Sequence, residues 1–181
     1  MSKFIALTLA FFFLFGCATP KVWRTVGEWN FNTRIYINNT HNLRLTVPDY
    51  WTVIDNEADK KEVEKRGMEW LVGGITNDQK IFVLTATRWV DKIEKLFKIS
   101  DSRASDPPSV DLVIERCKIG NVDIVERKGQ TKKDRKSYIE RAFVHNGYAY
   151  RLIVVSSSPL EREDVEILEN LWLGNASLRC R

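Results

Sequence analysis

The sequence is poor in the residues that build metal and catalytic sites. It has two histidines, His41 and His145, and three cysteines. Neither histidine lies in an HExxH pattern or in a Cys/His spacing of the zinc-site type. No GxSxG elbow accompanies Ser156-Ser157-Ser158, and Gly73-Gly74 lacks the rest of a phosphate-binding loop. The sequence therefore predicts no metal and no cofactor, and it offers no catalytic motif.

The chain also lacks a strong charge of one sign. Lys and Arg number 28 against 24 Asp and Glu, so the formal net charge is +4 at pH 7. This balance does not indicate a nucleic-acid partner, because such proteins concentrate a large positive excess on one face. No internal repeat or low-complexity segment is present, and the length fits one domain.

There is only one long hydrophobic run, and it lies at the N-terminus. Lys3 is followed by apolar residues from Phe4 to Phe15, interrupted only by Thr8, and then by Gly16. This order is typical of a secretory signal peptide. As a helix the run would reach about 18 Å, short of a bilayer core of roughly 30 Å, so an uncleaved transmembrane anchor is the weaker interpretation.

The end of this run, Leu14-Phe15-Gly16-Cys17, resembles the lipobox of bacterial lipoproteins, with Phe15 in place of the usual smaller residue. The resemblance implies a cleaved signal over residues 1–16, acyl chains such as palmitate on Cys17, and a tether over 17–30 that holds the protein to a membrane of the cell envelope. Ala18, rather than aspartate, favours the periplasmic face of the outer membrane over the inner. The alternatives are an ordinary signal peptide followed by a cysteine, and a buried thiol.

The other two cysteines, Cys117 and Cys180, form an even pair once Cys17 is acylated. In an oxidising compartment such a pair predicts a disulfide. The alternative is that Cys117 is a buried thiol and Cys180, one residue from the end, is free.

The remaining pattern predicts strands that alternate with a few helices. Strands are expected at 33–37, 43–47, 68–72, 81–89, 122–127, 138–144 and 148–155. Asn146-Gly147 supplies the positive φ values of a type I′ hairpin turn. The charged stretch 55–66 is a solvated loop or a weak surface helix.

Three segments have helical features. Trp89, Ile93, Leu96 and Phe97 fall at helical spacing. Asp106 and Pro107 predict the start of a second helix, whose buried face would be Val110, Val113, Ile114 and Cys117. The last helix is expected to run from Pro159, with Ser158 as N-cap and Glu161 completing a capping box, to Leu173 before Gly174.

The order of these elements resembles the PsbP-like fold. The likeness rests on Leu43–Trp51, on the hairpin Asn146–Leu152 and on the helix Pro159–Leu173, and it covers roughly residues 31–175. It implies a single α+β domain at 31–181, an antiparallel β-sheet with helices packed on it. Members of that family are mostly accessory or binding proteins, and no catalytic residues are carried over.

The segment Arg127–Lys136 has six basic residues and one acidic residue. A solvated loop is the plain interpretation. The sharper hypothesis is that Lys132, Lys133, Arg135 and Lys136 bind an anionic partner, either lipid head groups near the tether or an acidic protein surface.

Taken together, these features predict a membrane-anchored envelope lipoprotein that acts as a non-catalytic binding module. The alternative is a cell-envelope hydrolase, which would need convergent carboxylates in a pocket, or a serine near His145, assembled only in three dimensions.

Overall fold

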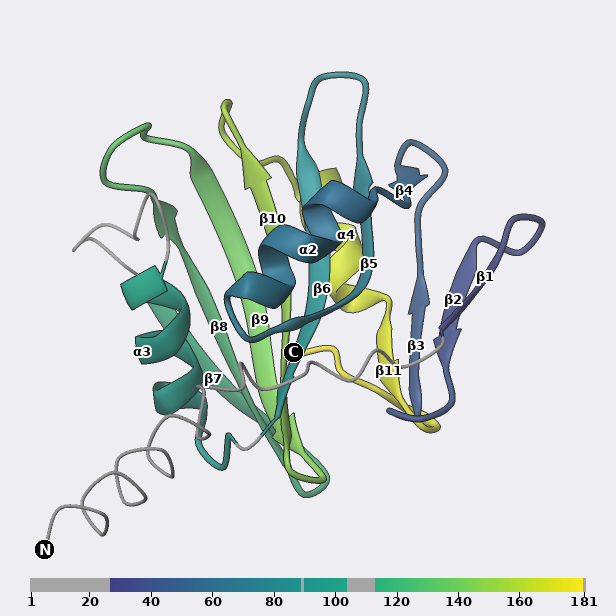
Figure 1. Ribbon diagram of the computed structural model, residues 1–181, viewed down its shortest axis with the longest axis vertical. Helices are drawn as coiled ribbons and strands as arrows, with labels where there is room; N and C mark the ends of the chain where they lie inside the picture. Colours follow the sequence, from purple (N-terminus) through teal and green to yellow (C-terminus); the bar gives the residue numbers. More distant parts are fainter. Residues whose placement is uncertain (1–26, 89, 104–112, 181) are drawn as a thin grey trace, which may run out of the picture.

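The computed structural model describes residues 27–88, 90–103 and 113–180, and within them it contains two antiparallel sheets that face each other (Figure 1). The smaller sheet has the order β1-β2-β3-β11-β12 and the larger one the order β4-β5-β6-β10-β9-β8-β7. The predicted α+β class is confirmed, with two sheets in place of one.

The bounds of the strands follow from hydrogen bonding between neighbours. The smaller sheet consists of β1 Glu28–Asn30, β2 Ile35–Asn38, β3 Leu43–Thr46, β11 Leu171–Leu173 and β12 Ala176–Ser177. The larger sheet consists of β4 Thr52–Ile54, β5 Glu69–Ile75, β6 Ile81–Arg88, β7 Val113–Ile119, β8 Val122–Gln130, β9 Ser137–His145 and β10 Tyr148–Ser156. The helices are α2 Glu57–Lys65, α3 Ile93–Arg103 and α4 Arg162–Glu169.

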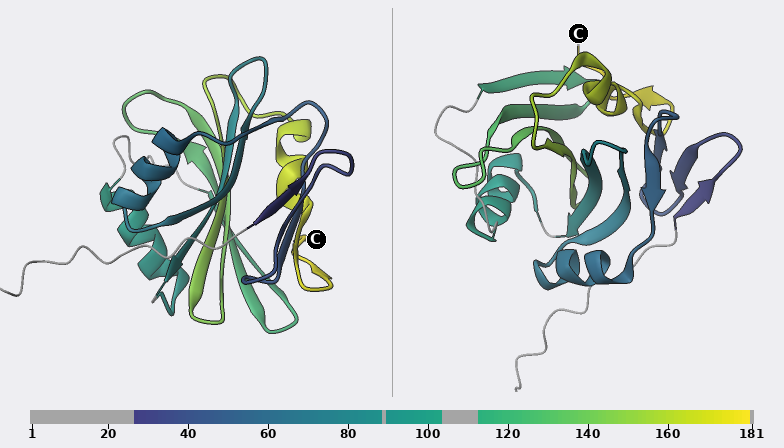
Figure 2. Two further views of the ribbon diagram at one scale, coloured as in Figure 1. Left: turned by 45° about the vertical axis from the view of Figure 1, so that its right-hand side comes forward. Right: turned by 90° about the horizontal axis from the view of Figure 1, so that it is seen from above.

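The main core lies between the two sheets. Both sheets and α4 contribute fully buried side chains to it, among them Leu45, Phe82, Phe143, Leu152 and Leu168. Burying each such side chain contributes about 1.5–3 kcal/mol relative to leaving it in water. A second, smaller core lies on the outer face of the larger sheet, where Ile93 and Leu96 of α3 pack on that sheet. Figure 2 shows α2 and α3 together on this outer face.

Several local predictions are confirmed. The Asn146-Gly147 turn joins β9 to β10 with φ values of +50° and +76°, as the type I′ geometry requires. The charged stretch forms the surface helix α2, in which no residue is buried. Asn56 caps it by accepting a hydrogen bond from the Ala58 N–H at 2.9 Å, and Gly67, at φ +74°, follows its end.

The helix predicted to end near Cys117 is wrong. Residues 104–112, with Asp106, Pro107 and Val110, lie outside the described residues, but Val113–Ile119 is the edge strand β7. Ile114, predicted to face the core, is 51% exposed. Gly120-Asn121 then turns the chain into β8, with Gly120 at φ +58°. A glycine-asparagine pair between two β-rich runs is a hairpin signal, and here it outweighs the helical spacing.

The C-terminal helix is shorter than predicted. It begins at Arg162, and Glu161 is its N-cap in place of Ser158, because the Asp164 carboxylate accepts a hydrogen bond from the Glu161 N–H at 2.7 Å. It ends at Glu169, and Leu171–Leu173 pairs with β3 as strand β11. Gly174, at φ +58°, therefore turns a strand rather than ending a helix.

Two observations concern the ends of the chain. Strand β1 pairs with β2, so the first strand of the domain lies inside the stretch predicted as tether. At the other end a disulfide joins Cys117 to Cys180, with Cα atoms 5.9 Å apart. This Cα separation is usual for a disulfide, and the bond fastens the C-terminal segment to edge strand β7.

Candidate functional site

The strand register places Ser156 at the opposite end of the β9–β10 hairpin from His145. The register of β9 and β10 pairs His145 with Tyr148 at one end of the hairpin and Ser137 with Ser156 at the other. The two ends are eight residue steps apart along the strand, a distance of roughly 27 Å. Ser156 and Ser158 instead hydrogen-bond each other at 2.9 Å. Ser156 and Ser158 are therefore not placed to pair with His145.

His41 belongs to a buried polar cluster. Its ring is buried between the sheets, where Nδ1 lies 3.0 Å from the Tyr150 hydroxyl and Nε2 lies 3.4 Å from a Glu69 carboxylate oxygen. Burial raises the pKa of Tyr150, which therefore stays a neutral hydroxyl. The cluster links β10, β5 and the β2–β3 turn through satisfied polar contacts, which rigidify a core. The position of His41 in a predicted turn gave no sign that its side chain is buried.

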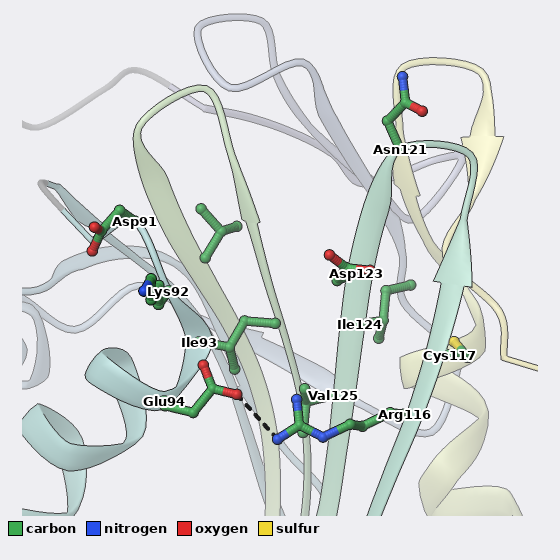
Figure 3. Close-up of a pocket in the computed structure, with 11 residues that line it drawn as sticks. Asp91, Lys92, Ile93, Glu94, Arg116, Cys117, Asn121, Asp123, Ile124 and Val125 are labelled. Carbon is green, nitrogen blue, oxygen red and sulfur yellow. Dashed lines mark ion pairs between the residues drawn. The ribbon is translucent and has the colours of Figure 1, made fainter.

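A polar groove of about 370 Å³ lies between the start of α3 and the β7–β8 hairpin (Figure 3). Three carboxylates line it, but Asp91 and Asp123 are on opposite sides, and Glu94 forms an ion pair with Arg116 at 3.0 Å. Backbone hydrogen bonds hold the pKa of Asp91 and of Glu94 below the usual range. The carboxylates of Asp91 and Asp123 therefore do not converge in this groove, as an acid and base pair would require.

An aromatic cleft of about 410 Å³ is the feature best suited to binding. It opens where the two sheets meet, between β1, β4, β5 and α2. Four aromatic side chains line it, together with four aliphatic ones: Trp29, Phe31, Tyr36 and Trp70, with Val53, Ile54, Leu71 and Val72. Asp55, Lys60 and Glu64 form its polar rim. Aromatic and aliphatic side chains together with a few polar groups are the usual lining of a ligand site.

The cleft depends on close packing at its N-terminal side. Trp29 and Phe31 meet edge to face with ring centroids 6.1 Å apart, and Phe31 is 82% exposed. The indole Nε1 of Trp29 is buried and has no acceptor among the described residues. A Cβ on Gly27 would lie 2.1 Å from the Tyr36 hydroxyl oxygen, so only glycine lets the backbone pass over that ring.

Sequence reasoning missed this cleft, although one signal was present. Trp29 and Phe31 stand two residues apart, the spacing that places side chains on one face of an extended chain. The predicted boundary after residue 30 places Trp29 in the tether and Phe31 in the domain. The other walls come from residues 53–72, which only folding brings close.

The predicted basic patch lies on the loop between β8 and β9. Its four members, Lys132, Lys133, Arg135 and Lys136, are exposed. Within the loop Lys136 lies 3.8 Å from Asp134. Arg127, counted with the same basic stretch, is instead buried in an ion-pair cluster. Strands β8 and β9, which the loop joins, lie toward one edge of the larger sheet, and β4 and β5, which carry part of the cleft lining, lie at the other edge (Figures 1 and 2).

No family model and no curated protein matches the sequence. In structure the chain is similar to the cyanobacterial PsbP protein (CyanoP) of Synechocystis sp. PCC 6803. The TM-score is 0.50 at 6% identity, over 87% of this chain and 97% of that one. The domain has a PsbP-like fold. LpqN of Mycobacterium tuberculosis, involved in cell envelope biogenesis, is also similar, with a TM-score of 0.43 at 14% identity over 71% of this chain and 76% of that one.

Other features were sought among the described residues. No helix in residues 27–88, 90–103 and 113–180 is long and apolar enough to cross a membrane. Within the same ranges no group of three or more His, Cys, Asp or Glu side chains is placed to hold a metal ion. The residues of the lipobox, Leu14 to Cys17, lie outside the described part of the chain.

Proposed function

We propose that this chain is an exported lipoprotein of the bacterial envelope, anchored through acyl chains on Cys17, whose PsbP-like domain acts by binding rather than by catalysis. The lipobox-like Leu14-Phe15-Gly16-Cys17 supports the anchor. Two or more acyl chains make attachment stable, since each buried CH₂ contributes about 0.8 kcal/mol. The periplasmic face of the outer membrane is the expected location, because Ala18 follows the cysteine.

One observation carries the binding role: the domain presents a basic loop toward the edge of the larger sheet that lies away from the aromatic cleft, beside which the chain from Cys17 enters. The described chain starts at Gly27 beside this cleft, and the loop with Lys132, Lys133, Arg135 and Lys136 joins strands β8 and β9 toward the other edge. A domain held at one side thus offers its basic side to an anionic surface of another molecule. This arrangement favours an acidic protein or a facing anionic lipid layer over the head groups beside the anchor.

Changing the four basic loop residues should weaken anionic binding. We expect the chain that lacks residues 1–16 and carries Cys17→Ala to bind vesicles containing phosphatidylglycerol at low salt. Replacing Lys132, Lys133, Arg135 and Lys136 by Gln should reduce the affinity by at least about tenfold, because each basic residue near such a surface contributes about 1 kcal/mol. Vesicle co-sedimentation over a lipid titration measures the change.

The matched control removes the same charge elsewhere. It replaces four exposed lysines scattered over the domain: Lys61, Lys65, Lys92 and Lys118. If both variants lose affinity equally, net charge explains the binding and the loop has no special role. If neither variant nor the parent binds, an acidic polypeptide such as polyglutamate is the second probe, and failure with both probes contradicts the proposed anionic partner.

A further inference from the structure

We propose that the outer face of the smaller sheet is a docking surface for a second copy of this chain. The face is centred on strand β2, where Ile35 and Ile37 would meet the same two residues of the other copy across a two-fold axis. Glu28, on one side of this apolar spine, and Arg44, on the other side, would then form ion pairs between the copies. The surface is thus complementary to itself, as a two-fold interface requires.

The first argument is the strand register, which aligns one row of side chains across this face. Ile37 pairs with Glu28 of β1 and with Arg44 of β3, and Arg44 pairs in turn with Trp172 of β11. Paired residues of neighbouring strands point to the same side of a sheet. The residues directly before and after Ile37, Arg44 and Trp172 are all buried. The row itself therefore points away from the core.

The second argument is that the described part of the chain leaves this face uncovered. Ile37 is 41% exposed, and Glu28 and Arg44 are exposed on either side of it. Helices α2 and α3 lie on the outer face of the larger sheet, and α4 packs into the core between the sheets. In Figure 2 no described helix or strand lies outside the smaller sheet. The isoleucine spine is therefore apolar surface that another molecule can cover.

The third argument is the pair of opposite charges that flank the spine. Neither the Glu28 carboxylate nor the Arg44 guanidinium forms an ion pair with any described residue. Arg44 instead stacks over the Trp172 ring, 4.7 Å from its centroid, which holds the guanidinium in place on the face. An anionic partner would pair with Arg44 but would set a like charge against Glu28. A second copy supplies the opposite charge to both residues and so fits the face better.

Two-fold symmetry brings these charges together. Strand β2 lies between β1 and β3, so a rotation of 180° about an axis along β2 exchanges the positions of the two flanking strands. Ile37 then lies over the partner's Ile37, and Glu28 lies over the partner's Arg44. Because the contact is isologous, the ion pair forms twice. Two sheets that pack in this way lie about 10 Å apart, with strand directions within about 30° of each other.

The size of the face sets the expected strength of the contact. It has five strands of at most four residues each, and at a strand spacing of about 4.8 Å it covers roughly 20 by 12 Å. Contacts this small belong to weak, transient complexes. We therefore expect a dissociation constant between about 10 μM and 1 mM. The consequence in the envelope rests on the proposed function, because anchoring in one membrane would raise the effective concentration of the copies.

Sedimentation equilibrium of the chain that lacks residues 1–16 and carries Cys17→Ala tests the dimer without the anchor. The apparent mass should rise from monomer toward dimer as the protein concentration increases from about 1 μM to about 1 mM. Glu28→Arg should weaken the association at least about tenfold, because it sets like charges against each other twice, and Arg44→Glu should do the same. The double variant exchanges the two charges and should recover most of the association.

The matched control is Glu115→Arg, which makes the same charge change at an exposed residue of edge strand β7 and should leave the dissociation constant within about twofold. A parent protein that stays monomeric over the whole concentration range would overturn the proposal. A double variant that associates no better than the single variants would also overturn it. The intact mass of the membrane-extracted parent tests acylation separately, so failure of the anchor and failure of the dimer are told apart.

Discussion

Replacing Glu140 by Gln is expected to reduce the free energy of unfolding by about 3–5 kcal/mol. Glu140 is 0% exposed, and its two carboxylate oxygens bind Arg127 and Arg151. Arg127 is itself buried, bonds Asp101 at 2.9 and 3.0 Å, and lies 3.6 Å over the Phe97 ring. The substitution would remove the carboxylate that Arg127 and Arg151 share on the outer face of the sheet, although Arg127 would still pair with Asp101, and breaking a buried ion pair is costly.

Chemical denaturation of the two proteins measures this loss, and the same substitution at an exposed site is the control. Glu115 pairs with Lys128 at 3.0 Å on strands β7 and β8, where both side chains are half or more exposed. Glu115→Gln should change stability by less than about 1 kcal/mol, because exposed ion pairs contribute little. A Glu140 variant no less stable than the Glu115 variant would show that the buried cluster does not hold α3 to the sheet.

Removing the disulfide should have an effect of similar size. Cys117 and Cys180 are separated by 63 positions, and opening a loop of that length is expected to lower the unfolding free energy by about 4 kcal/mol. The cause is that the unfolded chain regains the freedom that the bond removed. The double variant Cys117→Ser, Cys180→Ser and the reduced parent protein should therefore unfold at similar denaturant concentrations, both well below the oxidised parent.

A comparison of parent protein with and without reductant provides the control for the serine substitutions. The double variant should be insensitive to reductant. If the oxidised parent is no more stable than the double variant, the bond contributes nothing to the free energy of unfolding. That result would favour the alternative of a buried Cys117 thiol with a free Cys180.

Local signals with a single meaning predicted the structure well. Asn146-Gly147 demands positive φ at two adjacent residues and could only be a tight turn, and it fixed the β9–β10 hairpin. Ile93 and Leu96 lie one helical turn apart and are buried as expected. Such patterns need no information from distant parts of the chain.

The error at β7 shows where a pattern has two meanings. Val113 and Cys117 are four residues apart, and a separation of four places residues on one face of a helix and also on one face of a strand. The exposure of Ile114 and the turn at Gly120-Asn121 both indicate a strand. The exposure of Ile114, however, is known only from the structure.

The two candidate sites, Cys17 and the aromatic cleft, differ in how far the sequence alone could predict them. Cys17 was predicted from four consecutive residues, Leu14-Phe15-Gly16-Cys17, without information from the rest of the chain. The aromatic cleft joins Trp29, Tyr36 and Trp70 from separate strands of two sheets. Its existence depends on the packing of those sheets, which residue periodicity does not specify.

The account rests on acylation at Cys17, and the intact mass of the membrane-extracted protein tests it most directly. The measurement compares the parent chain with Cys17→Ala. We expect the parent to begin at residue 17 and to carry added acyl mass, and the variant to lack both the cut and the acyl groups. A parent protein of 21.0 kDa, full length and without acyl chains, would contradict the anchor and the location argued from it.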